Sequence, residues 1–374
     1  MEQSTANGSA AASNSKLAQL IEKEKKSKIK WGYLWAIIGA IMWGTMYLPG
    51  VAVWKIPDFT DPVFPKGTAG ILATVVVIAI GSGVVKSIIT LGFWDLGESK
   101  LSDVPKAIKH WKISRVMLFT TLLASPLGVG GYQLATGLVG GSFAAASSLL
   151  AGAFAGIGAT LLFKEKMSKK AAIGITAIII GGIFIFNPAG LINDINSSGG
   201  GIASILGYIG GFFAALTWGL EGVFVSRVSD FYDYAMSMTL RAVFDLFLWV
   251  FFCLPLALLA FGTDTIFGIM AHIYVHPAFW LWEVLYVCGF SAYVGMYRSF
   301  PLIGSGRGMS VSSLYVIPGF LSLYFFMGEA IGWWIILGTV IAIAGTLYMY
   351  SESGESLADG TRVVEDDELT TALA

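Results

Sequence analysis

The sequence is poor in charged residues, cysteine and histidine, and these shortages exclude several kinds of protein. Only 13% of its 374 residues are charged, whereas a soluble domain carries about 25%. Its 2 cysteines, Cys253 and Cys288, lie inside apolar runs, where cysteine packs as a small residue. Its 3 histidines are scattered and no CxxC pair occurs, so no metal-ligand spacing is present. We therefore expect neither a metal site nor a cofactor.

Motifs for ATP-driven transport and for enzymatic catalysis are also missing. The chain contains no GxxxxGK[ST] phosphate-binding loop, which argues against an ATP-driven pump. No nucleophile–base pair stands out, so we do not expect an enzyme. The first 30 residues are polar, with KLAQLIEKEKKSKIK mixing Glu and Lys, and no secretory signal is evident. The net charge of -1 gives no indication of a nucleic-acid partner.

Apolar residues are abundant instead. They make up 56% of the chain, and the mean hydropathy is +0.74. They occur in runs of about 20 residues, the length of a membrane-spanning helix. The fold class predicted is an all-α polytopic membrane protein with ten transmembrane helices. The predicted spans are roughly 32–54, 67–91, 114–135, 141–163, 170–187, 201–226, 234–261, 277–302, 308–328 and 331–351.

Loop charges predict the orientation of these spans, because Lys and Arg concentrate on the cytoplasmic side. With the N-terminus inside, basic residues gather in the N-terminal tail, in 96–115 and in KEKMSKK (164–170), whereas the outside loops hold only Lys55 and Lys66. We therefore expect a multi-pass protein of the plasma (cytoplasmic) membrane with both termini cytoplasmic. KEKMSKK either only sets topology or also touches anionic lipid.

Two halves of the chain repeat each other. At an offset of 175, Gly32, Tyr33, Ala40, Trp43 and Gly44 match Gly207, Tyr208, Ala215, Trp218 and Gly219. At an offset of 164, Gly131, Leu138, Gly140, Ser148, Leu150, Glu165, Gly174, Ile179 and Gly181 match Gly295, Leu302, Gly304, Ser312, Leu314, Glu329, Gly338, Ile343 and Gly345. Five spans per half require opposite orientations, and such inverted repeats are typical of secondary transporters.

The predicted organisation follows from this repeat. Residues 31–187 form the first five-helix repeat and residues 201–351 form the second. A polar, glycine-rich extracytoplasmic linker, 188–200, joins them. A polar cytoplasmic tail, 1–30, precedes the first repeat, and an acidic cytoplasmic tail, 352–374, follows the second. We expect the substrate site near the membrane midplane, between the halves.

The two repeat starts, AIIGAIMWGTMYL (36–48) and FFAALTWGLEGVFVSR (212–227), and the later stretches 146–186 and 312–350 resemble the drug/metabolite transporter superfamily in its ten-helix EamA-like form. The resemblance covers roughly 30–351 and implies transport of small organic metabolites by alternating access. The start of the first span also resembles the glucose/ribose uptake branch. The loop 55–66, the segment 95–112 and the N-terminal tail are longer than a minimal member needs.

Aromatic residues are the first candidates for the site. Trp43 and Tyr47 are four residues apart and share a helix face, and the repeat places Trp218 at a depth comparable to that of Trp43. One interpretation is an aromatic cavity between the halves, able to bind a cation over a ring face. The other is helix packing or an interfacial belt.

Glu221 is a carboxylate inside an apolar run, where an ionised group costs roughly 2.5 kcal/mol or more. It is interpreted either as a proton-coupling group or counter-ion, or as a residue near the inside end of its span that reaches the interface close to Arg227. Its repeat counterpart is Met46, so the feature is asymmetric. Lys86 is expected to reach the inside interface.

Arg241 and Asp245 lie four residues apart on one helix face. The favoured interpretation is an ion pair within that helix, and the alternative is that one of them exchanges partners with the substrate. Glu221 would compete with Asp245 for Arg241 if the sixth and seventh spans pack together.

Polar groups in the third and eighth spans complete the candidates. Tyr132, Gln133, Tyr293 and Tyr297 are expected to supply polar groups at one depth. Arg298 is expected to extend to the interface, the alternative being an anion-binding role. Separately, Glu165 and Glu329 are expected to be structural, and Pro126 and Pro318 are expected to kink their helices.

We therefore expect a secondary active transporter that moves an amine, amino acid or related amphiphilic solute by alternating access, with a proton or ion as a coupling partner. The alternative within transport is uptake of a sugar, since sugar sites also use aromatic faces. A membrane enzyme or structural membrane protein is the third interpretation. The other partners expected are the lipid bilayer and a second copy of the chain.

Overall fold

A computed structural model gives the structure of the protein and describes residues 2–56, 65, 67–94, 100–164, 167–196, 201–228, 231–290, 292–303, 308 and 311–349. These residues form helices and connecting turns, with no strand among them. Seven helical segments in this part of the chain are long and apolar enough to cross a membrane, which indicates an integral membrane protein. They are Gln19–Lys55, Gly67–Gly92, Trp111–Leu138, Gly141–Phe163, Lys169–Asn193, Gly201–Val225 and Tyr234–Phe261.

The described helices follow one another with short connections. In the first half they are α1 (Glu2–Ala52), η1 (Val53–Lys55), α2 (Gly67–Ile89), η2 (Thr90–Trp94), η3 (Leu101–Asp103), α4 (Val104–Lys109), α5 (Trp111–Leu122), η4 (Leu123–Val129), α6 (Gly130–Leu138), α7 (Gly141–Ser147), η5 (Ser148–Leu150), α8 (Ala151–Phe163), α9 (Lys169–Phe186) and α10 (Pro188–Asn196). In the second half they are α11 (Gly201–Val228), α12 (Tyr234–Leu248), η6 (Trp249–Cys253), α13 (Leu254–Phe261), α14 (Thr263–Val275), α15 (Pro277–Phe290), α16 (Ala292–Ile303), η7 (Ser313–Tyr315), α18 (Val316–Met327) and α19 (Trp333–Met349).

The seven long segments coincide with the first seven predicted spans. The eighth predicted span is described as two shorter helices, α15 and α16, and the ninth and tenth contain the apolar helices Ser313–Met327 and Trp333–Met349. The prediction of ten transmembrane helices therefore stays a prediction for these last three regions. The predicted acidic tail, Glu165 and most of the loop 55–66 lie outside the described residues.

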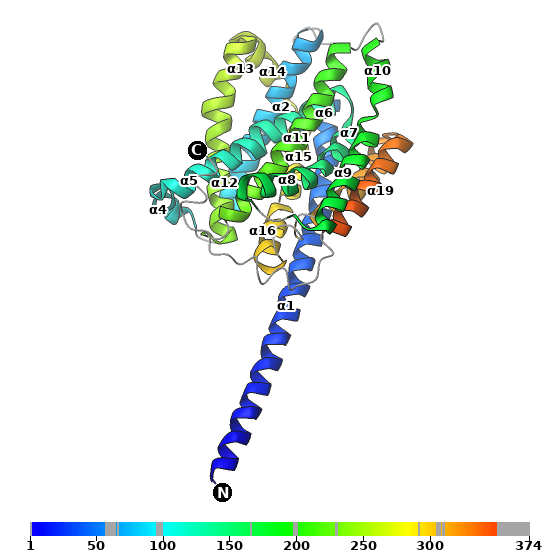
Figure 1. Cartoon of the computed structure of the whole chain (residues 1–374). Helices are drawn as coiled ribbons and strands as arrows, with labels where there is room; N and C mark the ends of the chain where they lie inside the picture. The colour runs from blue at the N-terminus through cyan, green and yellow to red at the C-terminus, as the bar shows by residue number, and fades with distance from the viewer. Residues whose placement is uncertain are drawn as a thin grey trace.

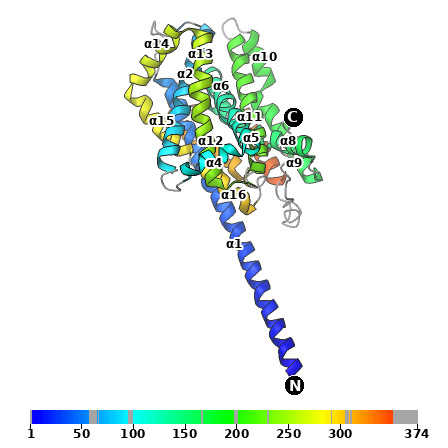
Figure 2. The same cartoon turned by 90° about the vertical axis from the view of Figure 1, so that its left-hand side faces the viewer.

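Two helices lie in segments predicted as outside loops. α10 falls within the predicted linker, and α14 follows α13 after Gly262, whose φ of 84° suits glycine. α14 packs against α2 and buries Ile266, Ile269 and Ile273 completely. Both helices lie at the end of the bundle opposite the first part of α1, which projects from it as one continuous helix (Figures 1 and 2).

Two of the prolines affect their helices differently. Pro126 lies inside η4, a π-helical segment that interrupts the α-helix between α5 and α6, as expected where a ring replaces a backbone N–H. Pro318 is the third residue of α18 and directly follows the 3-10 turn η7, within the continuous apolar helix Ser313–Met327. The regular α-helix is thus interrupted just before Pro318, and the expected kink there stays a prediction.

Close helix contacts recur at the two sequence offsets. Gly44 on α1 lies against the backbone of Tyr315, and Gly219 on α11 lies against the backbone of Ala151, so closely that neither glycine leaves room for a Cβ. Gly219 follows Gly44 by 175 residues and Tyr315 follows Ala151 by 164. The contact of α1 with the η7–α18 region is thus repeated by α11 with the η5–α8 region.

Further contacts obey the same relation. Gly39 on α1 packs against Gly295 on α16, and Ala214 on α11 packs against Gly131 on α6. Two glycine contacts join α9 and α19, Gly174 with Gly345 and Gly181 with Gly338. Adding 164 to the α9 residue of one contact gives the α19 residue of the other. Small residues at such crossings let membrane helices approach closely.

Candidate functional site

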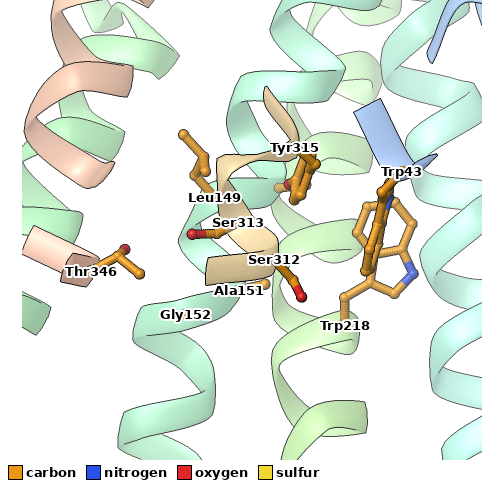
Figure 3. A pocket seen from close by; sticks show the side chains of 10 residues that line it. Trp43, Leu149, Ala151, Gly152, Trp218, Ser312, Ser313, Tyr315 and Thr346 are labelled. Atoms are coloured by element: carbon orange, nitrogen blue, oxygen red, sulfur yellow. The ribbon is translucent and has the colours of Figure 1, made fainter. Parts of the chain in front are cut away.

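A pocket opens where α1 and α11 meet the η5 and η7 turns. Its lining residues are Trp43, Ser148, Leu149, Ala151, Gly152, Trp218, Ser312, Ser313, Tyr315 and Thr346. The cavity has a volume of about 30 Å³, room for roughly one or two water molecules, so a larger solute would enter only if the walls moved apart. Figure 3 shows the two tryptophan rings at one end and Thr346 at the other. None of the described lining residues is charged.

Aromatic rings form one wall of this pocket. Trp43 stacks on Tyr315 with ring centroids 5.1 Å apart and meets the edge of Trp218 at 6.1 Å. Tyr47 stacks on the other side of the same cluster, 5.6 Å from Tyr315. Trp43 and Trp218 are therefore in contact across the two halves, and both line the pocket as the cavity interpretation requires.

Some polar groups of the pocket have hydrogen-bond partners and others have none among the described residues. The Ser148 hydroxyl contacts the hydroxyls of Tyr47 and Tyr315. The Trp218 indole N–H donates to the Ala124 carbonyl at 2.8 Å, in the π-helical segment around Pro126. By contrast, the Trp43 indole N–H and the Ser312 hydroxyl are buried without a hydrogen-bond partner among the described residues. An occupant of the pocket could satisfy both groups.

Tyr132 and Gln133 take different places. The Tyr132 ring lies 5.4 Å from Tyr47, inside the aromatic cluster. The Gln133 amide oxygen instead accepts a hydrogen bond from the Trp54 indole at 2.8 Å. The four polar residues predicted to share one depth are thus divided between separate contacts.

A cluster of buried charges lies beside the pocket. Glu221 on α11 forms an ion pair with Arg241 on α12, and Lys86 on α2 lies 2.6 Å from a carboxylate oxygen of Asp245 on α12. All four side chains are at most 5% exposed. Glu221 and Lys86 therefore do not reach the interface, and the prediction for Lys86 was wrong because its partner lies inside the bundle.

Arg241 and Asp245 each pair with a neighbouring helix rather than with each other. The favoured expectation of an ion pair within α12 is replaced by the two interhelical pairs. α12 packs against α2, which brings Lys86 to Asp245, and the long Arg241 side chain reaches Glu221 on α11. Glu221, which the sequence offered as a competitor of Asp245 for Arg241, forms the ion pair with it, through the side chains rather than through extensive packing of α11 on α12.

Arg241 also connects the charges to the pocket. It donates a hydrogen bond to the Tyr297 hydroxyl at 3.0 Å, and its guanidinium lies 3.9 Å from the centre of the Tyr293 ring. The Tyr293 ring lies 5.1 Å from Trp43. A continuous line of contacts thus runs from Glu221 through Arg241 and Tyr293 to the pocket wall.

Glu283 on α15 belongs to the same interior and was missed. Its carboxylate accepts a hydrogen bond from the Ser82 hydroxyl at 2.7 Å. Ser82 lies on α2, one helical turn before Lys86. The signal was available, since Glu283 stands in an apolar run (PAFWLWEVL) much as Glu221 does. Ser125 joins the region as well, accepting from Trp249 at 3.0 Å and contacting Lys86 at 3.1 Å.

Arg298 and Glu329 lie apart from these charges. The Arg298 guanidinium is half-buried between the rings of Trp35 and Tyr234, each 4.6 Å away. Glu329 accepts a hydrogen bond from the Ser142 N–H at 2.8 Å, at the start of α7, where a negative charge is favourable. Arg298 thus packs among aromatic rings at the edge of the bundle, and Glu329 makes a structural contact.

The comparisons with known proteins name no family. No family model matches the chain, and no curated protein matches it. One solved structure, described only as the crystal structure of a protein, aligns over 85% of this chain and 97% of its own with 16% identity and a TM-score of 0.41. Within the described ranges, no group of His, Cys, Asp or Glu side chains is arranged to hold a metal ion.

Proposed function

We propose that the protein is a secondary active transporter that moves a small organic metabolite across the membrane by alternating access. The observation that carries the proposal is the buried charge cluster beside a pocket in a membrane bundle. Ionisable residues in membrane helices are costly, and they commonly mark solute and ion pathways. Here the line of contacts through Arg241 and Tyr293 joins them to the pocket.

An inverted repeat of two five-helix halves, as in the drug/metabolite transporter superfamily, is part of this proposal. The support is the set of contacts that exchange at the offsets 175 and 164. The pocket lining contains two pairs of identical residues related by these offsets, Trp43 with Trp218 and Ser148 with Ser312. A site between repeats is where alternating access places the substrate, because the halves rock around it.

The orientation with both termini cytoplasmic in the plasma membrane is also proposed. It is supported by the sided distribution of Lys and Arg. The position of α10 and α14 at the end opposite the projecting start of α1 agrees with it (Figure 1). Labelling of a cysteine introduced into the N-terminal tail, with a reagent that does not cross the membrane of intact cells, tests this orientation. An N-terminus that is labelled from outside would contradict it.

The pocket favours a solute with both a ring-stacking face and hydrogen-bonding groups. Two tryptophans and a tyrosine offer faces, and Ser148, Ser312 and Ser313 offer hydroxyls. An amine or amino acid would place its cationic end over a ring. The unpartnered Trp43 N–H and Ser312 hydroxyl suit a sugar hydroxyl equally well, so sugar uptake remains the second candidate.

The test is transport by purified protein in liposomes without ATP. A panel of amines, amino acids and sugars is first screened by thermal shift, and the hits are tested for uptake. We expect Trp43→Ala to abolish uptake of a hit and Trp333→Ala, which removes a ring that is 67% exposed, to preserve it. Absence of uptake for every solute that shifts the melting temperature would contradict the proposal.

A further inference from the structure

The buried interior holds one acidic residue more than its ion pairs account for. Glu221 pairs with Arg241, and Asp245 pairs with Lys86. Glu283 is 1% exposed and has no ion-pair partner among the described residues. One of its oxygens accepts the Ser82 hydroxyl hydrogen, and the other is buried without a hydrogen-bond partner in the same set of residues.

The surroundings of Glu283 offer no free cation. α2 presents Ser82 and Lys86, which already holds Asp245, and α14 presents Tyr274, whose hydroxyl donates to the Val77 carbonyl. The other charged or titratable groups on elements packed against α15 are Tyr33 and Tyr47 on the part of α1 within the bundle, Lys55 of η1, Asp264 and His272 of α14, and Tyr293, Tyr297 and Arg298 of α16. Lys55 donates to the Met327 carbonyl and Arg298 lies over the Trp35 ring. Tyr47, Tyr293 and Tyr297 belong to the aromatic cluster.

An unpaired carboxylate in such a place is strongly unfavourable, and a buried carboxyl group takes up a proton instead. In the protonated acid one oxygen carries the hydrogen itself, and the other accepts the hydrogen bond from the Ser82 hydroxyl. Of the three buried acids, Glu283 is thus the one whose contacts fit the neutral form. Glu221 and Asp245 instead each form an ion pair with a basic side chain.

We propose that Glu283 is the proton-binding residue of this transporter. A change in its protonation would affect the pocket through successive changes of ion-pair partner at Lys86, Asp245 and Arg241. The proposal rests on the transport function proposed above. In one half of the cycle the Glu283 carboxylate takes a proton from water on one side, and in the other half it returns that proton to water on the opposite side.

The coupling follows from the order of the side chains. Glu283 is held by Ser82, which lies one helical turn from Lys86 on α2, so an ionised Glu283 competes with Asp245 for that ammonium. Asp245, one turn from Arg241 on α12, then competes with Glu221 for the guanidinium. Because Arg241 lies against Tyr293, and Tyr293 against Trp43, a change of partner at Arg241 alters the pocket wall.

Infrared difference spectroscopy of the purified full chain in lipid vesicles, titrated with pH, tests the protonation directly. A protonated carboxyl gives a carbonyl stretch that a carboxylate lacks and that shifts in D₂O. We expect this band in the native protein at neutral pH, its loss in Glu283→Gln and its retention in Glu221→Gln, the matched buried acid. Ser82→Ala should shift the band without removing it, since it removes only the hydrogen bond to Glu283.

Other outcomes of this measurement overturn the proposal. Retention of the band in Glu283→Gln, or its absence from the native protein at neutral pH, would show that Glu283 is not the proton-bearing group. Gln closely matches the shape of the neutral acid, so this variant should fold, which circular dichroism checks. The spectrum needs no substrate, so failure of the proton site and failure of the transport proposal are separate results.

Discussion

The pocket and the buried charge cluster lie next to each other but are built in opposite ways. The pocket is walled by residues that the two halves share, such as Trp43 with Trp218, and its described lining carries no charge. The two glutamates of the charge cluster have no charged counterpart: at the repeat offsets, Glu221 matches Met46 and Glu283 matches Phe119. In the proposed transporter, the shared positions build the scaffold around the solute site, and the unshared ones supply charge to one side of it.

The largest effect is expected from breaking the charge cluster. Arg241→Gln leaves Glu221 buried without its cation, and removal of one partner of a buried pair costs about 3–5 kcal/mol. We expect the free energy of unfolding in detergent to fall by about that amount. The double variant Glu221→Gln/Arg241→Gln should recover part of the loss, because neither charge then remains unpaired.

The control for this prediction is Arg227→Gln, since Arg227 is half-buried and lies 4.7 Å from the Phe163 ring. We expect it to cost less than about 1 kcal/mol, the range of exposed charge contacts. Equal stability of Arg241→Gln and the native protein would contradict the ion pair described here.

A second prediction concerns the shared scaffold. Gly44→Ala and Gly219→Ala each place a Cβ against the backbone of the neighbouring helix, and overpacking of this kind costs about 1–3 kcal/mol. Because the two contacts are related by the proposed repeat, we expect similar losses in thermal stability. Gly130→Ala is the control, since nothing lies within 4 Å of a Cβ there, and it should stabilise α6 slightly.

If one of the two glycine variants were as stable as the native protein while the other unfolded, the contacts would not be equivalent. That result would remove the main support for the repeat. It would leave the charge cluster and its contacts unaffected, because these use other positions.

The third prediction separates the two tryptophans of the pocket. Both Trp43→Phe and Trp218→Phe lose similar volume, but only Trp218 donates its N–H to a backbone carbonyl, that of Ala124. We expect Trp218→Phe to be less stable than Trp43→Phe by about 1 kcal/mol. Trp43→Phe should weaken solute binding instead, as measured by the ligand-induced shift in melting temperature. A reversal of this order would show that the pocket uses the indoles differently.

The smallest effect is expected at Asp233, outside the charge cluster. Partial burial opposes its ionisation, but bonds from the Met236 N–H and the Lys100 ammonium outweigh this and hold the pKa of the carboxyl below its usual range. Because the folded-state pKa is depressed, the stabilisation is present at neutral pH and is lost as the pH falls through that value. The side chain is 54% exposed, so we expect about 0.2–1 kcal/mol.

Asp233→Asn is the matched variant, because Asn also caps a helix well but does not titrate. Its stability between neutral and acidic pH should change less than that of the native protein. An identical pH profile for both would exclude a contribution from Asp233.

Much of the pocket could be predicted from sequence, because the repeat marks Trp43 and Trp218 as equivalent and spacing puts Tyr47 on the same face. The charge cluster was predicted only in part. Glu221 and Arg241 stood out as charges in apolar runs, but the partners of Lys86 and Asp245 depend on how α2, α12 and α15 pack. Spacing along one helix cannot reveal that arrangement, which is why the ion pair within α12 was favoured.

The helix α14 was missed for a different reason. Its 13 residues are too few for a membrane span, and the segment was read as a loop. The apolar positions Ile266, Ile269 and Ile273, at helical spacing, were nevertheless a signal of a buried helix face.

The division between the two regions is tested most directly by comparing solute exchange with proton-driven accumulation in the same liposomes. With a solute identified by the panel, Glu283→Gln should keep counterflow exchange within about twofold of the native rate, since the pocket is intact, and should lose accumulation driven by a pH gradient. Glu329→Gln, which changes a carboxylate away from the cluster, should keep both. Loss of pH-driven accumulation with exchange retained is the result that the account predicts. Full pH-driven accumulation by Glu283→Gln would contradict it.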